Sequence, residues 1–507
     1  MSQNVGQATT ETPPRPLEPA RPGRAGGRTW LAAAVALAVA FALRLPLMNA
    51  GLFHHDEVQL ARAVEGSYRQ HRILPAVKGR HGAVLLNLAF YAPYHAMTGR
   101  SAERVVPFTG IATGALLVAL MVLLAAELAG DGLAGALAGA FTGGSALFLT
   151  SSSTGKENVP QMALVALALW LLARGAARPS AALRIAGLAT FGFALTVHEG
   201  GVLLVPPFAL SLIALAVHHG RPWRAAALDL AVLLASLAVP MAASIWDELR
   251  RNLFVSGANS ATFLGPFSPL LGTALRDAVV GLGAPTVALA AVGAALALRR
   301  RRWALLALLP WPLVIVYFGN VSSYTPRYLL YALPATAALA GAGAAALLRR
   351  WLPARAGLAG AMLAVAACAP GVARALPLLA ARATRSGPKA MALLVRERTA
   401  PGAVILCQDD SPHLEYYAPG RTLLKQPLGD AYATAAFVHD LKERARGGTP
   451  VYAGAYAFTY DPSGYFQLVL QSAFALVPVG EVANEWFYRP ELEDVSFRDV
   501  LVRLEPR

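Results

Sequence analysis

Long apolar blocks separated by short polar links fill most of this chain of 507 residues. The blocks run to roughly 15 to 22 residues, and at about 1.5 Å of rise per residue such a helix crosses a hydrocarbon core about 30 Å thick. They predict a polytopic α-helical membrane protein with about eleven transmembrane helices. The predicted spans are residues 30–48, 106–128, 133–150, 159–174, 183–197, 201–217, 225–245, 278–298, 303–318, 328–348 and 356–376.

One further apolar stretch, Ala83 to Met97, is ambiguous because it contains Asn87, Pro93 and His95. Arginine-rich links decide its place, since positive residues stay on the cytoplasmic side. If the stretch is not a span, the N-terminal tail and all the arginine clusters fall on one side. The clusters are Arg174 with Arg178 and Arg184, Arg221 with Arg224, Arg299 to Arg302, and Arg349 with Arg350 and Arg355. We therefore expect an interfacial helix there.

This arrangement places the N-terminus in the cytoplasm of a protein in the cytoplasmic (inner) membrane. Residues 1–28, rich in Pro, Arg, Thr and Gly, are expected to form a disordered cytoplasmic tail. The transmembrane domain is predicted over residues 29–376. The opposite, outer side receives the first loop, residues 49–105, together with the links 151–158, 198–200 and 319–327, the loop 246–277 and the C-terminal region.

After Arg385 the pattern changes to short mixed segments. Strand-like runs at 403–407 and 451–456, a helical run at 431–445, a further helical run and a final LVRL strand predict a small extracytoplasmic α/β domain over residues 385–507. In this domain, His413 with Asp409 and Asp410 is most simply a surface group.

Composition supports the membrane assignment. Hydrophobic residues make up 56% of the chain and charged residues 14%, whereas soluble domains carry about 25% charged residues. The net charge of +15 could indicate a nucleic-acid partner, but the arginines lie beside apolar blocks and form no basic stripe. No nucleic-acid partner is expected.

Four titratable residues follow one another directly after the first span: His54, His55, Asp56 and Glu57. One interpretation is a solvated loop in which Asp56 caps the next helix. A metal site is a weaker interpretation, because sequential neighbours rarely converge on one ion and the short zinc spacings are absent. No cofactor is predicted, and a divalent metal stays an open alternative.

The order of several motifs resembles the polyprenyl-phosphate-sugar glycosyltransferases of the GT-C superfamily, which includes protein O-mannosyltransferases and the aminoarabinose transferase of lipid A. The resemblance covers roughly residues 30 to 345. It rests on Asp56-Glu57, Leu60-Ala61-Arg62, Ile73-Leu74-Pro75, Lys78 to His81, the apolar helix ending at Gly99, Arg104, the links SSSTGKENVPQ with Glu157 and FALTVHEGGVLLVPP with His198-Glu199, and the stretch SSYTPRYLL with Arg327 and Tyr328.

This resemblance implies a GT-C-like fold with interfacial helices in the first outer loop. It also implies inverting transfer of a hexosyl or pentosyl group from a polyprenyl-phosphate donor to a membrane lipid, a cell-envelope glycan or a protein. Asp56 would be the general base, since burial and neighbouring charges can tune a carboxylate. Glu57 would orient a substrate or a cation, and Glu157 would hold the acceptor or the sugar.

Arg327 would bind the donor phosphate, because a guanidinium binds phosphate bidentately and stays charged. The alternative is an interfacial anchor that snorkels from the end of a span. The remaining substrate-binding candidates are Lys78, Arg80, His81, His55, Tyr328, His198 and Glu199, although His198 and Glu199 could equally form a solvated link.

Two other functions stay open. A secondary transporter is also a basic polytopic chain, but it should carry polar or broken helices at mid-membrane, where this chain has mostly Ala, Leu, Val and Gly. A non-catalytic member that binds lipid-linked glycans is the other, because the family's lysine is absent from the link at His198-Glu199.

Overall fold

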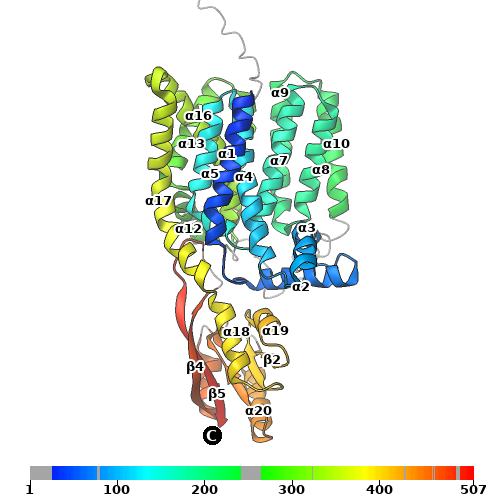
Figure 1. Cartoon of the computed structure of the whole chain (residues 1–507), viewed down its shortest axis with the longest axis vertical. Coiled ribbons are helices and arrows are strands. Elements are labelled where there is room, and N and C mark those ends of the chain that lie inside the picture. The colour runs from blue at the N-terminus through cyan, green and yellow to red at the C-terminus, as the bar shows by residue number, and fades with distance from the viewer. Residues whose placement is uncertain are drawn as a thin grey trace, which may run out of the picture.

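The computed structural model describes residues 26–76, 80–240, 264–265, 267–321, 324–427, 430–459, 461, 463–486 and 491–507. A helical bundle occupies one end of the molecule and a smaller domain with a sheet occupies the other (Figure 1). The predicted cytoplasmic tail lies almost wholly outside the described residues, as does most of the loop 246–277.

Each of the eleven predicted spans overlaps at least one helix of the bundle. The helices are α1 (Gly27–Arg44), η1 (Leu45–Leu47), α4 (Val105–Ala129), α5 (Gly132–Gly144), α6 (Ala146–Ser152), α7 (Asn158–Ala177), α8 (Ala181–Leu195), η3 (Glu199–Leu204), α9 (Val205–His218), α10 (Trp223–Pro240), α12 (Pro269–Leu282), α13 (Ala284–Arg299), α14 (Trp303–Leu306), α15 (Leu313–Phe318), η5 (Pro326–Ala332), α16 (Leu333–Trp351), η6 (Pro353–Arg355) and α17 (Ala356–Thr384).

Six helical segments of the described chain are long and apolar enough to cross a membrane, and up to eight if two bent pairs each count as one span. The bends are 65° between α5 and α6 and 99° between α12 and α13. At the first bend, Ser145 leaves helical geometry and its hydroxyl accepts a hydrogen bond from the Phe148 amide at 3.3 Å. At the second, Gly283 has a φ of +93°, which a residue without Cβ adopts at little cost. The chain is a membrane protein, and the count of eleven spans stays a prediction.

The first outer loop forms two helices, α2 (His55–Gln70) and α3 (His81–Thr98). In Figure 1, α2 runs across the lower end of the bundle, between the bundle and the C-terminal domain. The buried face of α2 includes Val58, Ala61 and Val64, which share an apolar cluster with Ala83 and Val84 of α3. α3 is not among the six candidate spans, and its interfacial position stays a prediction.

The C-terminal domain contains α18 (Gly387–Arg398), β1 (Val404–Cys407), α19 (Ser411–Tyr417), β2 (Thr422–Lys425), α20 (Ala431–Arg446), β3 (Val451–Ala453), η7 (Ala455–Phe458), α21 (Tyr465–Ala473), β4 (Phe474–Glu485) and β5 (Ser496–Pro506). The sheet order is β2-β1-β3-β5-β4. β1 pairs parallel with β2 and β3, whereas β5 pairs antiparallel with β3 and β4. The predicted small α/β fold is thus present, with two strands, β2 and β4, that were not expected.

This domain is attached to the first outer loop by side-chain contacts. The Lys389 ammonium lies 2.6 Å from the Glu103 carboxylate, and the Tyr416 hydroxyl donates to Glu65 at 2.7 Å. The sheet domain and α2 therefore lie at the same end of the bundle, and groups from both can contribute to one site.

Close packing of α13 on α16 depends on glycine. A Cβ at Gly293 would lie 2.0 Å from the Leu339 carbonyl oxygen, and one at Gly343 would lie 2.4 Å from the Leu289 carbonyl oxygen. Lipid gives helices no hydrophobic reason to associate, so close backbone contact of this kind must supply the attraction.

We expect Gly293→Leu to destabilise the bundle by about 2 kcal/mol or more, because the added side chain forces the two helices apart. Thermal unfolding of the protein in detergent measures this. The matched control is Gly357→Leu, at a position of α17 where an added Cβ meets no atom within 4 Å. Equal melting temperatures for the two variants would contradict the packing argument.

Candidate active site

The N-terminus of α2 places the two acidic residues singled out by the sequence. His54 is the residue that caps this helix, and its Nδ1 accepts a hydrogen bond from the Asp56 amide at 3.2 Å. The interpretation of Asp56 as the helix cap is therefore wrong. Asp56 lies inside the first turn, where the helix dipole favours a negative charge and its carboxylate is available for other contacts.

A buried charge network surrounds Asp56. Its Oδ2 atom lies 2.9 Å from Lys156 Nζ and 3.3 Å from Arg80 Nη1, while its Oδ1 lies 3.1 Å from His55 Nε2. Arg80 Nη1 also lies 2.9 Å from Glu157 Oε1. The network joins the first outer loop to the link 151–158, so four of the predicted residues, His55, Asp56, Arg80 and Glu157, do come together.

The network determines the ionisation of Asp56. Burial by itself would raise the pKa of this carboxyl, but Lys156 and Arg80 outweigh burial and hold the pKa well below its usual range. Burial and the nearby Arg327 lower the pKa of Lys156, and Asp56 and Glu157 oppose that change. Asp56 is thus an ionised carboxylate at every physiological pH.

Glu57 has a different environment although it is the next residue. Its Oε2 accepts a hydrogen bond from the Phe53 amide at 3.0 Å, and its Oε1 is buried with no hydrogen-bond partner among the described residues. Burial raises the pKa of Glu57 to about 7, against the opposing effect of Lys156. Glu57 therefore changes its charge near neutral pH.

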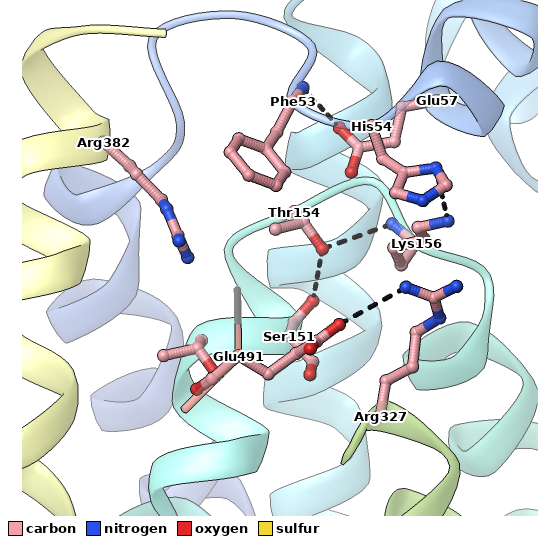
Figure 2. A pocket seen from close by; sticks show the side chains of 10 residues that line it. Phe53, His54, Glu57, Ser151, Thr154, Lys156, Arg327, Arg382 and Glu491 are labelled. Atoms are coloured by element: carbon pink, nitrogen blue, oxygen red, sulfur yellow. Dashed lines mark hydrogen bonds and ion pairs between the residues drawn. The ribbon is translucent and has the colours of Figure 1, made fainter. Parts of the chain in front are cut away.

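A pocket of roughly 330 Å³, part of it open to solvent, lies beside these groups (Figure 2). It is formed by the first loop, the link 151–158, η5, α17 and the C-terminal region. The lining residues are Phe53, His54, Glu57, Thr150, Ser151, Thr154, Lys156, Arg327, Arg382 and Glu491. The pocket thus combines several carboxylate and cationic groups at one end of the bundle.

Arg327 enters this pocket from the first turn of η5. Its side chain is 13% exposed, and its Nη1 lies 3.5 Å from Glu491 Oε1. In Figure 2 the guanidinium group points towards Glu491 and Lys156. A guanidinium in this position can meet an anion that enters the pocket.

Among the predicted residues that the structure describes, only Glu57 and Arg327 line the pocket, and the charge network around Asp56 lies beside it. Tyr328 stacks on Phe318 with ring centroids 4.4 Å apart, and His81 is the first residue of α3. His198 is 6% exposed and lies 3.1 Å from the Tyr331 hydroxyl, so the interpretation of His198 as part of a solvated link is wrong. Lys78 and the side chain of Glu199 lie outside the described residues.

Sequence reasoning did not single out Lys156, Arg382 or Glu491. Lys156 directly precedes Glu157 in a link already selected, so its charge next to a predicted site residue was a usable signal. The expectation that His413 lies at the surface is wrong, because its ring is 1% exposed and its Nε2 lies 3.3 Å from the Leu52 carbonyl oxygen.

A metal ion fits these residues poorly. Ligand atoms of His54, His55 and Asp56 lie within 4.8 Å of one another. However, Lys156 Nζ lies 2.7 Å from His54 Nδ1 and 2.9 Å from Asp56 Oδ2. A divalent ion bound through these two atoms would have to displace the ammonium group.

Comparison with known proteins supports the fold assignment. Residues 88–246 match the protein-family model for dolichyl-phosphate-mannose-protein mannosyltransferase. ArnT from Cupriavidus metallidurans, solved with undecaprenyl phosphate, is similar over 95% of this chain and 98% of its own, at 16% identity and a TM-score of 0.59. The predicted resemblance to these glycosyltransferases is confirmed at the level of the fold.

Two further GT-C structures share the fold. AglB from Archaeoglobus fulgidus, in complex with an inhibitory peptide and a dolichol-phosphate, matches over 89% of this chain and 73% of its own, at 14% identity and a TM-score of 0.62. The arabinofuranosyltransferase AftD from Mycobacteria matches over 96% of this chain and 42% of its own, at 19% identity and a TM-score of 0.51. No curated protein matches the sequence.

We expect Arg80→Met to destabilise the protein by about 3 kcal/mol, because it leaves the buried Asp56 and Glu157 carboxylates short of a cation. Adding Glu157→Gln should recover part of the loss. Chemical or thermal unfolding in detergent measures both. The control is Arg62→Met, which removes an ion pair to Glu415 whose side chains are 50% and 46% exposed, and which should cost about 1 kcal/mol or less. Equal losses of stability in Arg80→Met and Arg62→Met would show that the charge network contributes little to the stability of the fold.

Proposed function

We propose that this protein transfers a sugar from a polyprenyl-phosphate donor to an acceptor at the outer face of the cytoplasmic membrane, with inversion at the anomeric carbon. The observation that carries the proposal is that Glu57 and Arg327 line one pocket at the end of a membrane bundle, and that Asp56 lies directly beside it, in contact with the lining residue Lys156. A lipid-linked substrate presents its phosphate and sugar at that depth, next to the hydrocarbon core that holds its tail.

The donor phosphate would bind to Arg327. A guanidinium group offers paired N–H donors to phosphate oxygens and cannot lose its charge. Lys156 and Arg382 line the same pocket and add positive charge where the leaving group develops negative charge. The fold neighbours ArnT and AglB, solved with undecaprenyl phosphate and dolichol-phosphate, support a lipid phosphate as the ligand class.

Asp56 is the proposed general base. The acceptor oxygen attacks the anomeric carbon, the bond from that carbon to the phosphate oxygen breaks, and the phosphate leaves on its lipid as a monoester. The acceptor proton passes to the carboxylate. A single displacement of this kind inverts the anomeric configuration. Glu57 would orient the sugar or acceptor through its buried Oε1, and Glu157 would hold the acceptor or sugar while it anchors Arg80.

The sidedness of the reaction is part of the proposal. The arginine clusters favour a cytoplasmic N-terminus, and the pocket then opens on the outer side together with the C-terminal domain. A membrane lipid, a cell-envelope glycan or a protein hydroxyl could each serve as acceptor there. A secondary transporter is disfavoured because the polar groups of the pocket come from the first outer loop, the link 151–158, η5, α17 and the C-terminal region, which meet at one end of the bundle.

The direct test is incubation of the purified protein with a panel of polyprenyl-phosphate sugars and acceptors, scoring donor consumption and product. We expect turnover of one donor by the wild type and about a thousandfold slower turnover by Asp56→Asn, since a general base contributes roughly 10² to 10⁴ in rate. The Asp56→Asn protein should still bind the donor. Full activity in a folded Asp56→Asn protein would show that Asp56 is not the general base. Donor binding without turnover by the wild type would indicate a non-catalytic glycan-binding role.

The activity should also depend on pH through Glu57. Because its pKa is raised to about 7, Glu57 is protonated below that pH, and kcat/KM should fall about tenfold per unit as pH drops below 7 if the ionised form is needed. Glu57→Gln should be slower and should lose this dependence. A larger loss in Glu57→Gln than in Asp56→Asn would transfer the role of base to Glu57, and an unchanged pH profile in Glu57→Gln would remove Glu57 from the reaction.

A further inference from the structure

The C-terminal domain contributes a residue to the pocket. The connection between β4 and β5 returns to the bundle, and Glu491 from this connection lines the pocket beside Arg327 (Figure 2). No pattern in the sequence marks this acidic residue, and the proposed function gives it no role. An acidic side chain next to the proposed phosphate ligand is unexpected, since it repels the phosphate of the donor and of the product.

The backbone at Glu491 is firmly held. The Thr150 hydroxyl donates to the Glu491 carbonyl oxygen at 2.9 Å, and Arg374 Nε donates to the Leu492 carbonyl oxygen at 3.1 Å. The Leu492 side chain is 3% exposed and belongs to the main apolar cluster of the bundle. The position of Glu491 is therefore set by contacts with α6 and α17, independently of its own carboxylate.

The carboxylate itself is loosely held. Its Oε1 lies 3.5 Å from Arg327 Nη1, whereas strong charge-assisted pairs have a distance of about 2.7 to 2.9 Å. Its Oε2 is buried with no hydrogen-bond partner among the described residues. A phosphate with better geometry could displace it, and the carboxylate would return when the phosphate leaves.

We propose that Glu491 competes with the lipid phosphate for Arg327 and thereby promotes release of the polyprenyl phosphate product. The inference rests on the proposed role of Arg327. With the pocket empty, Glu491 neutralises the guanidinium group. The donor is a phosphodiester with one negative charge, whereas the product is a monoester with up to two, so a nearby carboxylate repels the product more strongly than the donor. Glu491 thus weakens binding of the product more than binding of the donor, and slow release of the product would limit turnover.

The test compares Glu491→Gln with the wild type, using undecaprenyl phosphate as probe and the full-length protein in detergent. Removing the competing charge while keeping the size of the side chain should tighten equilibrium binding of the probe about tenfold. In turnover assays, KM for the donor and kcat should both fall, and undecaprenyl phosphate should become a stronger product inhibitor. The matched control is Asp494→Asn, an exposed carboxylate of the same connection that accepts a hydrogen bond from the Ser496 amide at 3.0 Å and does not line the pocket. The Asp494→Asn change should leave the affinity for undecaprenyl phosphate, KM and kcat unchanged.

The outcomes separate the two proposals. If Glu491→Gln melts like the wild type but binds undecaprenyl phosphate equally or more weakly, the competitor role is overturned. Glu491 would then be a residue that positions Arg327. Absence of binding by both the wild type and Glu491→Gln overturns the proposed function and the competitor role together. Binding by the wild type without turnover removes the catalytic proposal only, because the binding comparison still tests Glu491.

Discussion

The organisation of the site depends on the buried ion pairs among Asp56, Arg80, Lys156 and Glu157. Removing such charges from water costs several kcal/mol per ion unless each finds a partner with good geometry. Asp56 and Arg80 come from the first outer loop, and Lys156 and Glu157 come from a link between two helices of the bundle. The two shortest pairs, Asp56 with Lys156 and Arg80 with Glu157, each join the loop to the link at 2.9 Å. These pairs hold the loop against the link, and the pocket forms where the two segments meet.

The same network gives two adjacent carboxylates different chemistry. Asp56 contacts two cations and has a pKa well below its usual range, whereas Glu57, held mainly by the Phe53 amide, has a pKa raised to about 7. Environments that separate the pKa values of neighbouring acids are the usual way in which one site obtains both a group that is ionised at rest and a group that titrates near neutral pH. Lys156 lies close enough to influence both, so it links the charge of one to that of the other.

Each span predicted from hydropathy overlaps a helix, because lipid requires continuous apolar segments whose backbone groups pair internally, but most of α12 (Pro269–Leu282) lies in the predicted outer loop 246–277. Hydropathy could not predict the bends, which depend on a cap at Ser145 and a positive φ at Gly283. β4 was not predicted because Pro478 and Gly480 interrupt its alternation of apolar and polar residues. The pairing of β4 with β5 is irregular at the same two residues. Motif order selected Asp56 and Arg327 as candidates, but the contact between Arg327 and Glu491 joins residues 164 positions apart and exists only in the folded chain.

That contact also bears on the role of the sheet domain at this end of the helical bundle. The domain touches the first outer loop through Lys389 and Tyr416, and through Leu492 it reaches into the apolar core of the bundle. A domain tied at both points cannot drift from the pocket. Its acidic residue is then presented on a fixed backbone with a loosely bound carboxylate, an arrangement suited to exchange with a ligand and poorly suited to holding the fold together.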